Sequence, residues 1–171
     1  MYDNILIPTD GTEETIEAVQ PGLELASQHD ATVHILHVIE NDLLKRVFSP
    51  RTVQAATNTA RQEGEEAVGS LQTRADEYDV ESVTWVLRAQ PAIGSRRAHE
   101  TIVEYAESNE VDLIVMGAST RGRISTILRP SVTHRVMSST DIPVFGRRLR
   151  RAVSYRQDQS THVPSGSESR E

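Results

Sequence analysis

Five short, mainly apolar runs recur along the chain, and four stretches with helical spacing of apolar residues lie between them. The apolar runs are residues 4–9, 31–39, 81–88, 111–116 and 142–146. We predict a β-strand at each, because mainly apolar runs are typical of strands that are buried on both faces. The intervening stretches predict helices over 13–29, over about 27 residues from Pro50, over 99–109 and over 130–139. Pro21 and Gly22 predict a kink or a split in the first helix.

Strands and helices alternate along the whole pattern. This alternation predicts an α/β fold: a single domain with a five-stranded parallel sheet and helices on both faces. In such folds a ligand binds at the carboxyl ends of the strands, where the strand order reverses. Three loops leave those ends, after Thr9, after Val38 and from Gly117. Candidate chemistry is therefore expected there.

Charge and composition divide the chain of 171 residues near Arg148. Residues 149–171 are polar and rich in arginine and offer little apolar surface to bury, so we predict a disordered tail after a domain at 1–148. The whole chain has a formal net charge of -7. Residues 147–171 hold six arginines and three acidic residues, so the remainder carries -10.

Several classes of protein are excluded or disfavoured by composition. There is no cysteine, which excludes disulfide scaffolds and thiol catalysis. No apolar run is long enough to cross a membrane, and the first residues do not resemble a signal peptide. The acidic balance opposes nucleic-acid binding. We expect a soluble cytoplasmic protein. Lys45 is the only lysine; a salt-rich cytoplasm and a codon bias toward arginine explain this equally well.

Two of the histidines and the tryptophan do not indicate an active site. His34 and His37 are three residues apart on a predicted strand, so they point to opposite faces and cannot easily share a metal ion. Trp85 is expected to pack on the sheet. The stretch from Gly117 to Arg123 imitates a phosphate loop, but Ile124 follows where a magnesium-binding hydroxyl is needed. We predict no catalytic residue and no metal site.

Four ordered segments resemble the universal stress protein family. They are ILIPTDGTEET at 5–15, ATVHILHVIE at 31–40, VDLIVMG at 111–117 and SVTHRVMSSTDIPV at 131–144. The resemblance covers roughly residues 3–146. It implies the five-stranded fold of adenine-nucleotide α-hydrolase-like proteins, which are commonly dimeric, and an ATP site in many members.

The resemblance also implies positions for that site. The acidic residue after the first strand matches Asp10, and the valine near the end of the second matches Val38. In the Gly-x2-Gly-x9-Gly-Ser/Thr loop, Gly117 matches the first glycine and Ser131 the last residue, but Thr120 and Pro130 replace the other two glycines. The implied nucleotide-binding residues are Pro8, Thr9, Asp10, Val38, Met116, Gly117, Thr120, Arg121, Ser131 and Val132.

The two replacements predict a weakened or altered nucleotide site. A threonine in a conformation suited to glycine costs about 1–2 kcal/mol. Proline has no N–H for a phosphate, and a hydrogen bond to a charged group contributes about 1.5–3 kcal/mol. Arg121 and nearby arginines could compensate with bidentate phosphate contacts.

These observations predict a non-catalytic stress-response or regulatory module with a weakened or altered adenine-nucleotide site. Two alternatives stay open: a genuine ATP-binding stress protein with at most slow hydrolysis, and an interaction scaffold that binds no nucleotide. The resemblance further implies a homodimer in which the strand Ile142–Gly146 pairs with its copy. A separate protein partner is also possible, whereas neither nucleic acid nor membrane is an expected partner.

Overall fold

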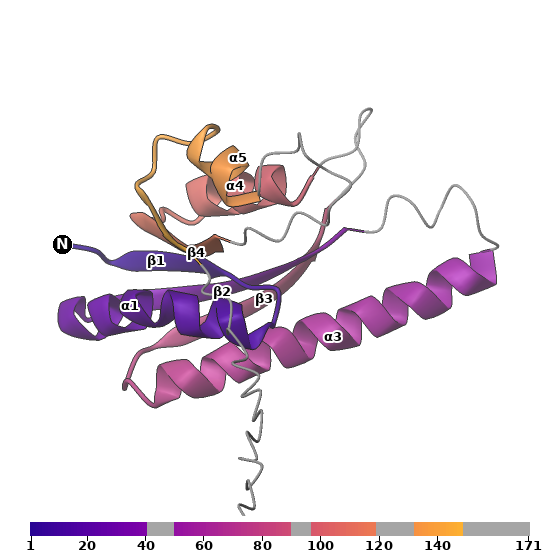
Figure 1. The fold of residues 1–171 in the computed structure, drawn as a ribbon, viewed down its shortest axis with the longest axis horizontal. Helices are drawn as coiled ribbons and strands as arrows, with labels where there is room; N and C mark the ends of the chain where they lie inside the picture. The colour runs from indigo at the N-terminus through magenta and orange to yellow at the C-terminus, as the bar shows by residue number, and fades with distance from the viewer. Residues whose placement is uncertain (41–49, 90–96, 119–131, 149–171) are drawn as a thin grey trace, which may run out of the picture.

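The fold is a single parallel sheet between two layers of helices (Figure 1). The computed structural model describes residues 1–40, 50–89, 97–118 and 132–148. The elements in chain order are β1 (Asn4–Pro8), α1 (Glu13–His29), β2 (Thr32–Ile39), α3 (Pro50–Asp76), β3 (Ser82–Arg88), α4 (Ala98–Ser108), β4 (Leu113–Ala118), α5 (Val132–Met137) and β5 (Val144–Arg148). The predicted α/β class is confirmed.

The strand order is β3-β2-β1-β4-β5, and every pairing is parallel. Because β1 pairs with β2 on one side and with β4 on the other, the chain reverses its direction of winding at β1 and β4. In the described part of the chain, β3 and β5 are the two edges of the sheet. The carboxyl ends of all five strands lie at one end of the sheet, where ligands bind in folds of this type.

Two apolar clusters hold the helices against the sheet. Helices α1 and α3 cover one face, and α4 and α5 cover the other (Figure 1). The first cluster joins Ile5 and Ile7 of β1 to Leu23 of α1 and Leu71 of α3. The second joins the intervening Leu6 to α4 and α5. Successive residues of β1 thus enter opposite clusters, as the two faces of a strand require.

Helix α1 runs unbroken through Pro21, so the predicted split is wrong. The buried positions Val19 and Leu23 hold the helix on the sheet on either side of the proline. Gly22 lets it approach closely: a Cβ there would lie 3.0 Å from the side chain of Val115 in β4. Burial of the apolar face therefore outweighs the single helical hydrogen bond that proline removes.

Strands β4 and β5 begin and end two residues later than their apolar runs suggest. Gly117 pairs with Arg147 and Ala118 with Arg148, which extends both strands beyond the predicted residues. Pro143 falls just before β5, where its missing N–H removes no bond from the sheet. The predicted tail at 149–171 lies outside the described residues, so the boundary near Arg148 stays a prediction.

Two absences hold for the described ranges. Within them, no helix is both long and apolar enough to cross a membrane. Nor do those ranges bring three or more histidine, aspartate or glutamate side chains together as a metal site would need.

Candidate functional site

The candidate site lies where β1 and β4 end side by side. Pro8 ends β1, and Thr9 continues its pairing by donating its N–H to the Leu36 carbonyl of β2 at 2.9 Å. Met116 and Gly117 lie near the end of β4. The parallel register thus brings the predicted residues of β1, β2 and β4 to one edge of the sheet, as the sequence interpretation required.

Thr9 has all its polar groups engaged. Besides its N–H bond to Leu36, its carbonyl accepts a hydrogen bond from Nδ1 of His37 at 3.0 Å. Its hydroxyl oxygen accepts one from the N–H of Gly11 at 3.1 Å. Thr9 is 7% exposed. The residue that precedes Asp10 is therefore held in place by three hydrogen bonds.

Asp10 binds the start of α1 through one oxygen. Its Oδ1 accepts hydrogen bonds from the N–H of Thr12 at 3.1 Å and from the hydroxyl groups of Thr12 at 2.8 Å and Thr15 at 2.7 Å. The N-cap of α1 is Thr12, whose hydroxyl accepts the N–H of Thr15 at 3.3 Å. Asp10 therefore supports the cap but is not itself the cap. No described residue donates to its second oxygen, Oδ2.

This arrangement keeps Asp10 ionised. Burial raises the pKa of its carboxyl, but the hydrogen bonds from Thr15 and Thr12 together outweigh that effect, so the pKa lies below the ordinary aspartate value. Asp10 is an exposed residue. The loop therefore presents a charged and oriented acceptor oxygen at the edge of the sheet.

Gly11 completes the loop and requires glycine for two reasons. Its φ is 77°, in the left-handed region that other residues rarely adopt. A Cβ at this position would lie 2.7 Å from the Cβ of Ala67 in α3. The loop after β1 is therefore packed directly on α3, which limits its movement.

The other described candidates lie toward the face covered by α4 and α5. Met116 is buried in the second apolar cluster, and Val38 packs against that cluster. Gly117 accepts a hydrogen bond at its carbonyl from the Thr133 hydroxyl at 3.1 Å, which ties α5 to the end of β4. Val132, the first residue of α5, is 41% exposed.

Three predicted site residues lie outside the described residues: Thr120, Arg121 and Ser131. Pro130, which replaces a motif glycine, lies outside them too. Their predicted roles stay predictions.

The two histidines and Trp85 take the structural roles that the sequence indicated, with one difference. His34 contacts the Tyr105 hydroxyl at 2.9 Å and Asn4 Oδ1 at 3.2 Å, whereas His37 contacts Thr9 on the opposite face. Trp85 lies on the sheet with its ring centroid 6.4 Å from that of Tyr105, but it is 49% exposed because β3 is an edge strand.

Three polar residues that shape the site were not among the predicted site residues. Thr12 and Thr15 orient Asp10, and His37 holds Thr9. The run Thr9 to Thr15 carries a sequence signal for the first two, because it contains three threonines around one aspartate. The contact of His37 joins residues 28 positions apart and has no local signal.

Comparison with known proteins identifies the family of this chain. The model of the universal stress protein family matches residues 1–145. Universal stress protein MJ0531 of Methanocaldococcus jannaschii is 31% identical over 145 residues, covering 85% of this chain and 81% of that protein.

Solved structures show the same fold. The structure of protein MJ0577 of the same organism has a TM-score of 0.67 at 24% identity, covering 89% of this chain and 99% of the other. A universal stress protein in complex with cAMP has a TM-score of 0.59 at 19% identity, covering 87% and 98%. The family model spans most of the chain, and this chain therefore belongs to the universal stress protein family.

Proposed function

We propose that this chain is a non-catalytic stress-response module. It would bind an adenine nucleotide weakly beside Asp10, at the carboxyl ends of the strands. The observation that best supports this proposal is the geometry of the Asp10 carboxylate. Its Oδ1 accepts three hydrogen bonds, whereas no described residue donates to Oδ2. Oδ2 would accept a hydrogen bond from a ribose hydroxyl or from the adenine amino group. A structurally similar universal stress protein in complex with cAMP supports this ligand class.

The expected weakness follows from the motif. Thr120 and Pro130 stand where nucleotide-binding members carry glycine. The proline removes one donor to phosphate, and such a bond contributes about 1.5–3 kcal/mol. Affinity would therefore be about ten- to a hundredfold lower than that of a site with both glycines. A mononucleotide, which depends least on a phosphate loop, is the ligand of choice for a first test.

Calorimetric titration with AMP, cAMP and ATP tests the proposal. The key variant is Asp10→Asn, because asparagine keeps an acceptor for the threonines but replaces the second oxygen with an amide donor. We expect AMP binding to weaken roughly tenfold or more. Asp112→Asn is the control, since Asp112 accepts hydrogen bonds from the N–H groups of Asp3 and Asn4 at the opposite end of the strands. Equal AMP affinity in both variants and the parent would refute the role of Asp10.

The phosphate loop is tested separately by a double replacement. Thr120→Gly with Pro130→Gly restores both motif glycines and is expected to tighten ATP binding. An assay for phosphate release in the same samples distinguishes a binding module from a slow ATPase. If the parent chain binds ATP tightly and releases phosphate, the proposal of a non-catalytic module is wrong.

We also propose a homodimer through the free edge of β5. In the described part of the chain, β5 pairs with β4 alone, so its outer N–H and C=O groups face no strand. Phe145 is 46% exposed on this strand, whereas Val144 packs against the second apolar cluster. A second copy related by a two-fold axis would pair with this edge and cover Phe145.

A further inference from the structure

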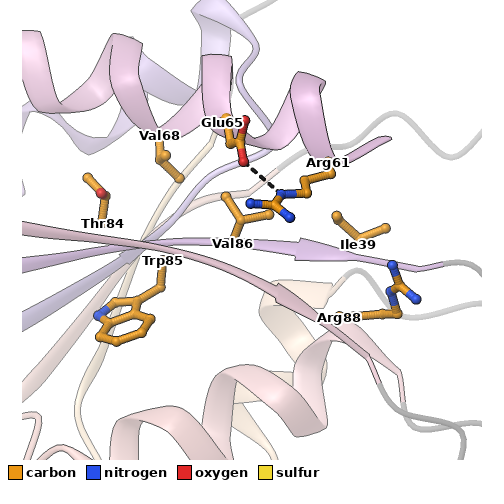
Figure 2. Close-up of a pocket in the computed structure, with 8 residues that line it drawn as sticks. All are labelled: Ile39, Arg61, Glu65, Val68, Thr84, Trp85, Val86 and Arg88. Carbon is orange, nitrogen blue, oxygen red and sulfur yellow. Dashed lines mark hydrogen bonds and ion pairs between the residues drawn. The ribbon is translucent and has the colours of Figure 1, made fainter. Parts of the chain in front are cut away.

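A pocket of about 420 Å³ lies between α3 and the carboxyl half of β3 (Figure 2). Its size is within the range of pockets that bind small molecules. It is lined by Ile39, Arg61, Glu65, Val68, Thr84, Trp85, Val86 and Arg88. Figure 2 shows that the ring of Trp85 points away from α3, so the lining side chains on this face come from the other seven residues.

The inner part of the pocket is apolar. Val68 of α3 and Ile39 at the end of β2 are each 6% exposed, and Val86 of β3 is half-buried. Gly64 keeps α3 close to the sheet beside this region, because a Cβ there would lie 2.9 Å from Val86. These residues offer a fixed apolar surface to a ligand.

Two arginines lie at the more open part of the pocket. Arg61 donates from Nε to Glu65 Oε1 at 2.8 Å, and this bond leaves its two terminal nitrogens without a partner among the described residues. The side chain of Arg88, at the end of β3, has no hydrogen bond or ion pair to any described residue. Figure 2 shows Ile39 between the two guanidinium groups. Two guanidinium groups therefore line the pocket on either side of the Ile39 side chain, in a body that carries -10 over residues 1–146.

The pocket shares no lining residue with the described part of the nucleotide site. Val68 belongs to the apolar cluster of α1 and α3, whereas Met116 belongs to the cluster of α4 and α5. Thr9 and Asp10 do not line the pocket. A ligand here would thus occupy a second site.

We propose that this pocket binds a small amphipathic anion, with its apolar body on Val68 and Val86 and its anionic group on Arg61 and Arg88. Guanidinium groups form bidentate bonds to carboxylate and phosphate alike, so both are possible anionic groups. The proposal is independent of nucleotide binding at Asp10.

Calorimetric titrations of the full chain with four probes separate the contribution of the apolar body from that of the anionic group. Octanoate and octyl phosphate carry the same apolar body with different anions, 1-octanol has no charge, and inorganic phosphate has no apolar body. We expect saturable binding of at least one octyl anion, with octanol and inorganic phosphate each binding at least tenfold more weakly. The tighter of the two octyl anions then identifies the anionic group.

Variants link the binding to the pocket. Arg88→Gln and Arg61→Gln are expected to weaken the octyl anion roughly tenfold each. Arg74→Gln is the matched control, because Arg74 is on the same helix but pairs with Glu77 at 2.9 Å outside the pocket. Melting temperatures of all variants check that the fold is intact, and AMP is expected not to displace the octyl anion. The proposal is overturned if neither octyl anion saturates, if the control weakens binding as much as the pocket variants, or if AMP competes.

Discussion

The guanidinium of Arg147 in β5 donates a hydrogen bond from Nη1 to the main-chain carbonyl of Glu17 in α1, at 3.2 Å. Glu17 lies four residues before Pro21, so its carbonyl would normally accept the N–H of residue 21. Proline has no N–H to donate. Arg147 thus supplies the donor that the helix lacks, and it joins the last strand of the fold to the first helix.

We expect Arg147→Met to lower the free energy of unfolding by about 0.5–1 kcal/mol, because the contact is exposed and uncharged at the acceptor. In a Pro21→Ala background the cost is expected to shrink, since the N–H of Ala at position 21 can bond to the Glu17 carbonyl. Urea unfolding of the parent, both single variants and the double variant measures this coupling. An equal cost of Arg147→Met in both backgrounds would contradict the explanation.

Two glycines of α3 are expected to respond in opposite directions to the same substitution. At Gly64 a Cβ would lie 2.8 Å from the His37 ring and 2.9 Å from Val86, whereas at Gly69 nothing lies within 4 Å. Gly64→Ala is therefore expected to destabilise the fold by about 1–3 kcal/mol. Gly69→Ala is expected to stabilise it by up to about 1 kcal/mol, because alanine favours a helix. Thermal unfolding of both variants checks this, and a loss of stability at Gly69 would show that helix propensity is not the controlling factor.

The strands were predictable from the sequence to a useful degree, and the reasons are local. Apolar runs located β1, β2 and β3 to within one residue at either end, because burial on both faces requires such runs. The ends of β4 and β5 were misplaced because Gly117 and Arg147 carry no strand signal of their own. These two residues adopt the strand conformation because they pair with each other. That pairing is a contact between distant parts of the chain.

The site was predictable only in its position. Asp10 could be selected because it follows a buried strand at the carboxyl edge of the sheet. The geometry of its carboxylate could not be predicted from the sequence. The oxygen that accepts the threonine hydroxyls is determined by side-chain rotamers and by the path of the loop. The role of Arg147 was equally hidden, since it compensates a proline 126 positions away in the sequence.

Acid pH is expected to test the hydrogen bonds of Asp10. Its folded pKa lies below the unfolded value, so its contribution to stability is present in full above the unfolded pKa and is lost as pH falls through the folded pKa. Thr15→Val removes the 2.7 Å bond and is expected to raise the pKa of Asp10 and to lower stability at neutral pH more than below pH 3. Carboxyl carbon shifts followed by NMR over this range give the pKa directly. An unchanged Asp10 pKa in Thr15→Val would exclude that bond as a cause.

His37 is expected to act as a positioning residue for the proposed nucleotide site. It donates from Nδ1 to the carbonyl of Thr9, the residue before Asp10. His37→Leu removes this donor and is expected to weaken AMP binding severalfold. His37→Asn places an amide donor near the position of Nδ1 and is expected to restore part of the affinity. Calorimetry with AMP compares the three proteins, with melting temperatures to check the fold. Equal affinities in the leucine and asparagine variants would indicate that only packing matters.

The proposed dimer makes the last prediction. Phe145→Asp introduces a charge at the exposed face of β5 and is expected to convert a dimer into a monomer in sedimentation experiments. Val83→Asp is the control, because Val83 is also exposed, at 36%, but lies on β3 at the other edge of the sheet. Val144 is less suitable for this purpose, since it packs against the apolar cluster of α4 and its replacement would disturb the fold. The strand ends in Arg147 and Arg148, and we expect the positive charges of two paired copies to repel each other. Salt screens that repulsion, so the dimer is expected to strengthen as ionic strength rises. A dimer that survives Phe145→Asp in a folded protein would show that β5 is not the contact.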